Sequence, residues 1–438
     1  CARSGSCCSR RCRCSRSSRA SAARATGRRC AGWTPSPVTE TARGRFGPGF
    51  LVTAAFVGPG TLTTASVAGA TSGFVLVWAL LFSIVTTLVL QVMAARLGLV
   101  SRLGLSEALR AQCAQPWVRR MLMGLVVVAI GVGNAAYEAG NIIGAALGAA
   151  ALLPLGQAPL VLLVSLLAAG LLYSGRYQLL ERVLIVLVAL MGGVFLASVL
   201  VAPPSPDLLR SVPDGAEPFG LTAVALIGTT VVPYNLFLHA SAVQARWAET
   251  VPLTTALREA RRDALVSIGF GGLVTLAVLS TAAVALLGAD VEVSAATMAR
   301  QLEPVLGPFA GLCFALGLLA AGLTSAITAP LAAAWAVCGA LGWRTELRAP
   351  AFRTVWATVL LFGAGTALLQ TRPVGVIVLA QAANALLLPI VAGALLWIMN
   401  REAVLGAERN GPLANLLGGG VLLVVVLLGG SRLLALAG

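Results

Sequence analysis

The hydrophobic residues of this chain fall into long runs that contain almost no charged residue. A run of about 20 apolar residues is long enough to cross the hydrocarbon core of a bilayer as a helix. Eleven such runs occur, and they predict eleven transmembrane helices in an all-α integral membrane protein. The runs are centred near Gly60, Leu88, Gly133, Val164, Val188, Thr230, Leu273, Leu316, Leu361, Pro389 and Val424.

The first and the sixth run are each interrupted near the middle by helix-breaking residues. The first interruption extends from Phe56 to Thr61 and reads Phe-Val-Gly-Pro-Gly-Thr; the second extends from Thr229 to Asn235 and contains Pro233. Proline lacks a backbone N–H group and glycine tolerates unusual dihedral angles, so neither run can form one continuous helix. Lipid offers no partner to the freed backbone groups, which must therefore face protein, water or a solute. Two breaks at matching positions predict the central binding site of a transporter.

The composition agrees with a membrane protein. Hydrophobic residues make up 58% of the chain and charged residues only 11%, against roughly 25% charged residues in a soluble domain. All 31 basic residues are arginine, and 27 of them fall on one predicted side of the membrane against 4 on the other. The positive-inside rule then predicts a multi-pass protein of the cell inner (plasma) membrane, with a cytoplasmic N-terminus and the C-terminus outside. The net charge of +15 is thus a topology signal, and no nucleic-acid partner is expected.

The first 45 residues differ in composition from the rest. They hold 11 arginines and six of the nine cysteines, without an apolar run. A metal-binding module is one interpretation of the cysteines, but no histidine accompanies them. A disordered tail, or an over-extended reading frame that is not native, is favoured instead. The transporter domain is accordingly predicted to span residues 46–438.

Two ionisable residues lie inside apolar runs. Glu138 shares one helical face with Asn134 and Asn141. A carboxylate at membrane depth is costly and usually lines a cavity or a proton route, although a protonated glutamate that only supports packing is the alternative. His239 is the only histidine and lies four residues after Asn235, on the half-helix that follows the second break. Its imidazole could handle protons near neutral pH, or it could be a satisfied core residue.

Several segments resemble the Nramp metal-ion transporters. The similarity is carried by the second run and the loop after it, by the sixth run and by two residues of the tenth. These segments are Trp78–Ser83, Leu90–Gln91, Ala94–Val100, Ser106–Arg110, Ala225–His239 and the pair Gln381 and Pro389. The resemblance implies the leucine-transporter fold, with broken helices 1 and 6 and a 5+5 inverted repeat. It assigns residues 46–202 to the first repeat, 219–399 to the second and 412–438 to an extra helix.

The motifs at both breaks depart from the pattern of that family. Typical members carry Asp-Pro-Gly-Asn where this chain has Gly58-Pro59-Gly60-Thr61, and Met-Pro-His where it has Val232-Pro233-Tyr234. By the family pattern, the lost Asp, Asn and Met are metal ligands, and the lost His belongs to the proton machinery. What remains is a neutral polar site.

The resemblance also indicates which residues would form the site. The expected substrate-binding residues are Gly58, Gly60, Thr61, Thr229, Thr230, Tyr234, Asn235 and Gln381. Thr61, Thr229 and Gln381 are the candidate metal ligands among them. A proton path is expected to use Glu138 and His239, together with Asn141, which stands where the family has a second acid, and Arg353, which matches a family arginine.

The leading hypothesis is a proton-linked secondary active transporter in a divergent branch of the Nramp superfamily. Manganese and iron sites use carboxylate, amide and thioether donors, which the breaks largely lack. Mg²⁺ dehydrates reluctantly and keeps several waters, so a neutral site of hydroxyls, amides and carbonyls favours a partly hydrated Mg²⁺-like cation.

Two other functions stay open at the level of sequence. One is a transporter of a neutral or anionic small solute, which would bind at the half-helix N-terminus after Gly60. The other is a membrane sensor that transports nothing. An enzyme is not expected, because no paired carboxylates, histidine cluster or nucleophile elbow occurs. No cofactor is expected either.

Overall fold

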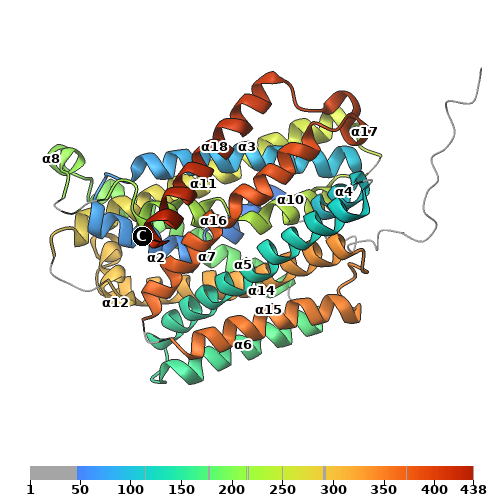
Figure 1. Ribbon diagram of the computed structural model, residues 1–438. Coiled ribbons are helices and arrows are strands. Elements are labelled where there is room, and N and C mark those ends of the chain that lie inside the picture. The colour runs from blue at the N-terminus through green and yellow to red at the C-terminus, as the bar shows by residue number, and fades with distance from the viewer. Residues whose placement is uncertain are drawn as a thin grey trace, which may run out of the picture. The chain divides into compact units, whose positions relative to one another are not determined.

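The computed structural model describes residues 47–113, 115–175, 178–213, 215, 217–248, 250–289, 293–370 and 372–437. Side chains are described throughout this part except at residues 178–184 and 431–437. All regular secondary structure in these ranges is helical, which confirms the all-α prediction (Figure 1). The predictions for the first 45 residues lie outside the described residues.

The first five predicted spans correspond to the helices up to residue 201. In chain order they are α1 (Pro48–Phe56) with α2 (Pro59–Ser72), α3 (Val77–Ser101), α5 (Pro116–Ala150), α6 (Gln157–Ser174) and α7 (Gln178–Val201). Two short helices, α4 (Leu105–Gln112) and α8 (Pro206–Arg210), lie in the connections.

The remaining six spans follow in the predicted order. They are α9 (Leu221–Thr230) with α10 (Pro233–Arg246), α11 (Leu253–Leu286), α14 (Ala310–Leu341), α15 (Pro350–Leu368), α16 (Pro373–Met399) and α18 (Pro412–Ala437). Short helical turns fill two of the connections: α12 (Ala295–Ala299), η1 (Arg300–Leu302), α13 (Glu303–Leu306) and η2 (Gly307–Phe309) before α14, and α17 (Glu402–Leu405) and η3 (Gly406–Glu408) before α18.

The lengths of these helices suit a membrane. Within the described ranges, nine helices are long and apolar enough to cross a bilayer, and α1 with α2 forms a tenth span that is bent by 54°. The predicted run around Val188 lies in α7, where the segment Ile185–Val201, whose side chains are described, is apolar but shorter. The eleven predicted spans thus each coincide with a helix or a helix pair.

The two breaks repeat one another in backbone geometry. Val57 and Gly58 separate α1 from α2, and Val231 and Val232 separate α9 from α10; a proline opens the second helix of each pair. Val57 and Val231 adopt similar dihedral angles, with φ −76° and ψ 60° against φ −95° and ψ 73°. Because proline has no N–H to satisfy, it is well suited to the first turn of a helix that begins inside the membrane.

The helix packing has the pairing expected of an inverted repeat. The first broken pair, α1 and α2, packs on α11, and its equivalent, α9 with α10, packs on α3. In the same way, α15 packs on α5 and the equivalent helix α6 packs on α14. The equivalent helices α5 and α14 pack against each other. Glycines permit the two equivalent approaches: a Cβ on Gly69 of α2 would overlap the Leu279 carbonyl of α11, and one on Gly98 of α3 would overlap the Ala240 carbonyl of α10.

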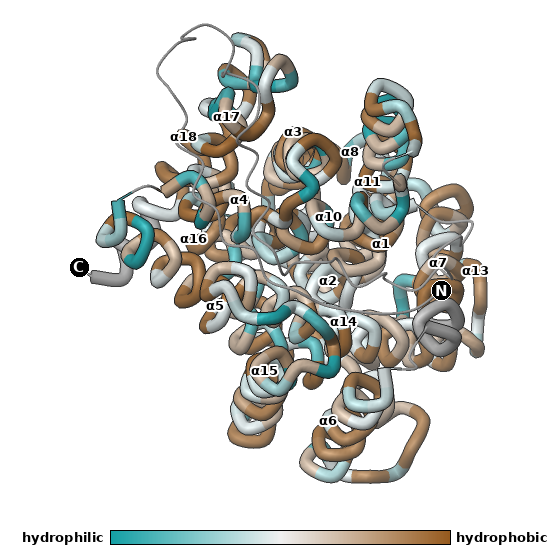
Figure 2. The backbone as a smooth tube through the Cα atoms, turned by 90° about the vertical axis from the view of Figure 1, so that its right-hand side faces the viewer, coloured by the Kyte–Doolittle hydropathy of each residue, from teal (hydrophilic) through white to brown (hydrophobic). Residues whose placement is uncertain are grey.

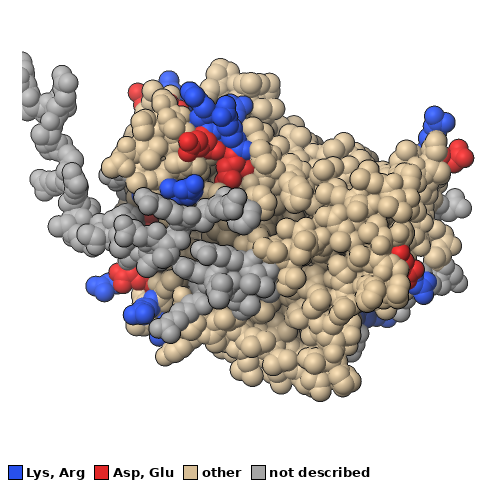
Figure 3. All heavy atoms as spheres, turned by 180° about the vertical axis from the view of Figure 1, so that it is seen from behind, with Lys and Arg blue, Asp and Glu red and all other residues tan. Residues whose placement is uncertain are grey.

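Polar and apolar residues are separated along the bundle. Figure 2 shows hydrophobic residues along most of the length of outer helices such as α6 and α7, with hydrophilic residues concentrated near helix ends. In Figure 3 the charged residues lie at two opposite ends, with a band of uncharged residues between them. This is the distribution that a bilayer imposes on a multi-pass protein.

Candidate functional site

The two helix breaks meet in the interior of the bundle, where α2 packs against α9. The hydroxyl oxygens of Thr61 and Thr229 lie 2.8 Å apart. Thr61 also donates its hydroxyl hydrogen to the carbonyl of Phe56, which the end of α1 leaves free. A hydroxyl has a single hydrogen, so Thr229 is the donor in the pair and Thr61 the acceptor. Two residues predicted to bind substrate thus join the breaks directly.

Hydroxyl groups also reach other carbonyls at the breaks. Thr87 of α3 shares its single hydroxyl hydrogen between the Ser83 carbonyl of its own helix, at 2.8 Å, and the Thr230 carbonyl, at 3.3 Å. Tyr234 of α10 donates to the Ala55 carbonyl of α1 at 3.5 Å, and its ring meets that of Tyr137 of α5 edge-on, with centroids 5.6 Å apart. These bonds satisfy the backbone groups that a broken helix exposes.

Gln381 of α16 lies beside the first break. Its side chain is 0% exposed, and neither its Oε1 nor its Nε2 has a hydrogen-bond partner among the described residues. A Cβ on Gly60 would overlap this amide, and a Cβ on Gly228 of α9 would overlap the Gln381 backbone carbonyl. Two glycines therefore bring Gln381 against both broken pairs, as the sequence predicts for a residue of the site.

Further unpaired polar atoms lie around the same breaks. Asn235 Oδ1 in the first turn of α10 and Ser325 Oγ of α14 are buried and have no hydrogen-bond partner in the described part of the chain. An unsatisfied buried polar group costs about 1–3 kcal/mol. Together with Gln381, these atoms form a neutral polar centre suited to a polar or cationic substrate. We define this centre by Thr61, Thr229, Asn235, Ser325 and Gln381, and we call it the break site.

Sequence reasoning missed Ser325. It belongs to an apolar run in which Thr324, Ser325 and Thr328 look like small packing residues, and no local motif distinguishes it. Only the packing of α14 against α1 reveals its position.

Glu138 is fully buried on α5 and is positioned by neighbouring helices. Its Oε2 accepts a hydrogen bond from Asn141 Nδ2 at 3.2 Å, while its Oε1 has no partner in the described ranges. Gly363 of α15 lies so close that a Cβ there would be 2.6 Å from Glu138 Cγ. Asn134, one turn earlier, donates to the Ala329 carbonyl of α14 at 3.1 Å. The predicted grouping of Glu138 and Asn141 is therefore present in the structure.

The other two residues of the expected proton path have partners elsewhere. His239 Nδ1 lies 2.9 Å from Gln91 Oε1 of α3, and its Nε2 has no partner within the described chain. The Arg353 guanidinium lies 4.4 Å from the centre of the Tyr173 ring. Arg353 precedes Gly363, the neighbour of Glu138, by ten residues, or about 15 Å along a helix. The structure does not bring Arg353 to Glu138, and the role of both His239 and Arg353 stays a prediction.

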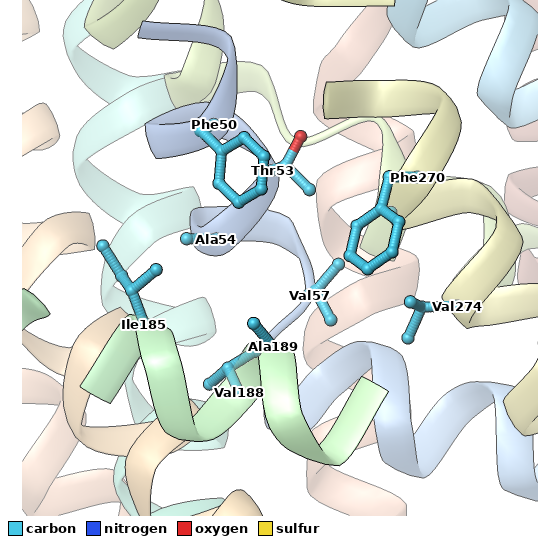
Figure 4. A pocket seen from close by; sticks show the side chains of 10 residues that line it. Phe50, Thr53, Ala54, Val57, Ile185, Val188, Ala189, Phe270 and Val274 are labelled. Carbon is cyan, nitrogen blue, oxygen red and sulfur yellow. The ribbon is translucent and has the colours of Figure 1, made fainter. Parts of the chain in front are cut away.

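An apolar hollow borders α1, and none of the five break-site residues lines it. Figure 4 shows the side chains around it, which come from α1, α7 and α11 and, with Val57, from the first break. Nearly all of them are hydrocarbon, with Thr53 as the polar exception. The described residues also hold no cluster of three or more His, Cys, Asp or Glu side chains that could bind a metal ion. A cation would therefore find polar oxygens at the break site and not in this hollow.

Comparison with known proteins identifies the family. A family model described as natural resistance-associated macrophage protein-like, or Nramp, matches residues 49–435. The chain belongs to the Nramp family. This confirms the resemblance drawn from the second, sixth and tenth runs.

Curated relatives cover most of the chain. The divalent metal cation transporter MntH of Acidiphilium cryptum is 29% identical over 403 residues, which cover 90% of this chain and 88% of the relative. MntH of Ralstonia nicotianae is 32% identical over 398 residues, which cover 84% of this chain and 86% of the relative. Both relatives are named as transporters, in agreement with the expectation that this Nramp protein is not an enzyme.

Solved structures support the fold. A manganese transporter of Eremococcus coleocola matches with a TM-score of 0.73 and 22% identity, over 87% of this chain and 84% of that one. Mhp1, a nucleobase-cation-symport-1 family transporter, matches with a TM-score of 0.56 and 12% identity, over 90% of this chain and 95% of that one. These matches place the Nramp chain among the leucine-transporter-type folds, as predicted.

Proposed function

We propose that this Nramp protein is a secondary active transporter that moves a partly hydrated, Mg²⁺-like divalent cation through the break site. The observation that carries the proposal is that both helix breaks are present while the side chains around them carry no charge. Curated relatives named as divalent metal cation transporters support a divalent cation as substrate. The breaks support passage at mid-membrane, because transporters bind their cargo at discontinuous helices.

The preference for a Mg²⁺-like ion follows from the side chains at the breaks. The side chains of Gly58 and Val232 offer no atom that could bind a metal ion. Thr61 offers a neutral hydroxyl where the family pattern has an amide. Mn²⁺ and Fe²⁺ would lack the carboxylate and thioether that favour them. Mg²⁺ keeps several of its waters, which hydroxyls, amides and carbonyls can bind.

Glu138 supports the transport of positive charge. It is the one acidic side chain that is buried in the described part of the chain, and Tyr137, its neighbour in sequence, contacts Tyr234 at the second break. We include a proton link through Glu138 in the proposal, because ionisable groups inside a membrane commonly serve proton relays. The orientation proposed is a cytoplasmic N-terminus in the inner membrane, because 27 of the 31 arginines fall on that side.

Uptake into proteoliposomes tests the proposal. Purified protein should accumulate Mg²⁺ in a saturable manner, and an excess of Mn²⁺ should compete only weakly. Micromolar Mn²⁺ binding by the unmodified protein would contradict the Mg²⁺-like preference. Uptake of a neutral or anionic solute without any cation would favour the solute transporter, and a protein that moves nothing would favour the sensor.

A further inference from the structure

Ser325 does not make the hydrogen bond that is usual for a hydroxyl in a helix. The hydroxyls of Thr324 and Thr328 donate to carbonyls one turn earlier, those of Ala320 at 2.8 Å and of Thr324 at 3.1 Å. Such back-bonding is the ordinary solution for Ser and Thr inside a helix. Ser325 is 0% exposed, yet its Oγ has no partner among the residues that the structure describes. Its position therefore needs another explanation.

The Ser325 hydroxyl faces the first break at Gly58. A Cβ on Gly58 would lie 2.8 Å from Ser325 Oγ and 3.9 Å from the carbonyl oxygen of Ala55. Two oxygens, one from α14 and one from α1, thus border the space that a side chain at position 58 would fill. The backbone of Gly58 is extended, with φ −102° and ψ −172°, so any residue could adopt it. What glycine contributes here is the missing side chain and not an unusual conformation.

The chemistry of these two oxygens suits a hard cation. A hydroxyl without a fixed partner can turn its lone pairs toward an ion or toward one of the waters around it. Among the described residues, the Ala55 carbonyl oxygen accepts the long 3.5 Å bond from Tyr234, which leaves it a second lone pair. Neutral oxygens of this kind are ligands that Mg²⁺ and Ca²⁺ accept, whereas softer ions prefer nitrogen and sulfur.

We propose that Ser325 contacts the substrate cation or its water shell, together with the Ala55 carbonyl, at the first break, where Gly58 carries no side chain. Ser325 is then a specificity-determining residue on α14, at the place where the chain lacks a carboxylate. This inference rests on the proposed function and adds to it a ligand outside both helix breaks.

The test compares Ser325→Ala with Thr324→Val in proteoliposomes. Ser325→Ala removes the proposed ligand and should raise the KM for Mg²⁺ uptake about tenfold, a factor that corresponds to about 1.4 kcal/mol. Thr324→Val removes the neighbouring hydroxyl, which is already bonded within its own helix, and should leave the KM unchanged. Thermal unfolding without added cation should give closely similar Tm values for the parent and Ser325→Ala.

A double-mutant cycle with Gly58→Ala sharpens the test. The added methyl group would occupy the space between the two oxygens, so Gly58→Ala should raise the KM as well. Adding Ser325→Ala to it should then have little further effect, because both changes remove the same contact. If Gly58→Ala does not fold, the KM of the single Ser325→Ala variant still decides whether Ser325 contacts the cation.

The outcomes separate this inference from the proposed function. A parent protein that takes up Mg²⁺, with an unchanged KM in Ser325→Ala, overturns the role of Ser325 alone. A parent that takes up no divalent cation overturns both. Equal losses in Ser325→Ala and Thr324→Val would show that α14 tolerates no change there, and this result too would overturn a ligand role for Ser325.

Discussion

At the scale of single residues, the break site combines positions that a sequence can reveal with one that it cannot. Thr61 and Thr229 lie at breaks that proline and glycine mark locally, whereas Gln381 is predicted from the resemblance to the Nramp proteins. The structure brings the three together through the hydroxyl pair and the amide beside Gly60, and their role in binding stays a prediction. Ser325 escaped prediction because its role depends on which helix packs against α1, and this is decided by the tertiary fold.

Restoring the missing ligands should change the ion that binds. Gly58→Asp, Thr61→Asn and Val232→Met together add a carboxylate, an amide and a thioether, which favour Mn²⁺ over Mg²⁺. The Asp Cβ would lie 2.8 Å from Ser325 Oγ, and such overpacking costs about 1–3 kcal/mol. The triple variant should therefore bind Mn²⁺ measurably by calorimetry only when Ser325→Ala provides the room.

The matched control is the same Ser325→Ala change in the parent, which should gain no Mn²⁺ affinity. A stable quadruple variant that still fails to bind Mn²⁺ would show that the geometry of the site has diverged along with its ligands.

Glu138 carries a second prediction at this scale. The proposed proton link places the exchanged proton on its carboxyl group, whose Oε1 has no partner among the described residues and whose Oε2 accepts one bond from Asn141. Glu138→Gln keeps the shape and removes the ionisable group, so it should abolish the pH dependence of cation uptake while the Tm changes little. Glu346→Gln, at an exposed position, is the control and should behave as the parent does. A pH response that persists in Glu138→Gln would make Glu138 a packing residue.

At the scale of elements, the breaks were more predictable than the contacts that hold them. Pro59 and Pro233 mark where α2 and α10 begin, since proline is accommodated best in the first turn of a helix, although Pro330 and Pro389 lie inside α14 and α16. The glycines that allow α9 to approach α16, or α5 to approach α2, carry no such local signal. Gly144 and Gly131 lie in the same 35-residue helix α5, yet a Cβ on Gly144 would overlap Pro59, whereas one on Gly131 would meet nothing within 4 Å.

This pair of glycines gives a matched test. Gly144→Ala should push Pro59 away and lower the free energy of unfolding by about 1–3 kcal/mol, which a lower Tm of the purified protein would report. It should also impair uptake, because Pro59 starts the half-helix that carries Thr61. Gly131→Ala should leave both properties unchanged. Equal Tm values for the two variants would show that α2 does not rest on α5 through Gly144.

At the scale of the whole molecule, hydropathy predicted the number and order of the spans, while the orientation that the arginines indicate stays a prediction. The apolar runs predicted every span, because a bilayer requires backbone hydrogen bonds to be satisfied within each helix. The pairing of α1 and α2 with α11, and of α9 and α10 with α3, could not be derived from hydropathy, which does not say which helices touch. The resemblance to the Nramp proteins implies an inverted repeat but does not state which helices touch, and the equivalent pairs in the structure agree with such a repeat.

The lack of a carboxylate at the breaks has an electrical consequence. Thr61, Thr229, Asn235, Ser325 and Gln381 carry no charge at any pH, so the break site itself neutralises nothing. Under the proposed function, a divalent cation at this site therefore carries two positive charges through the membrane field, beside the proton that Glu138 is proposed to exchange. The field contributes about 2.3 kcal/mol per elementary charge per 100 mV. An inside-negative membrane voltage should then favour the inward movement of the cation.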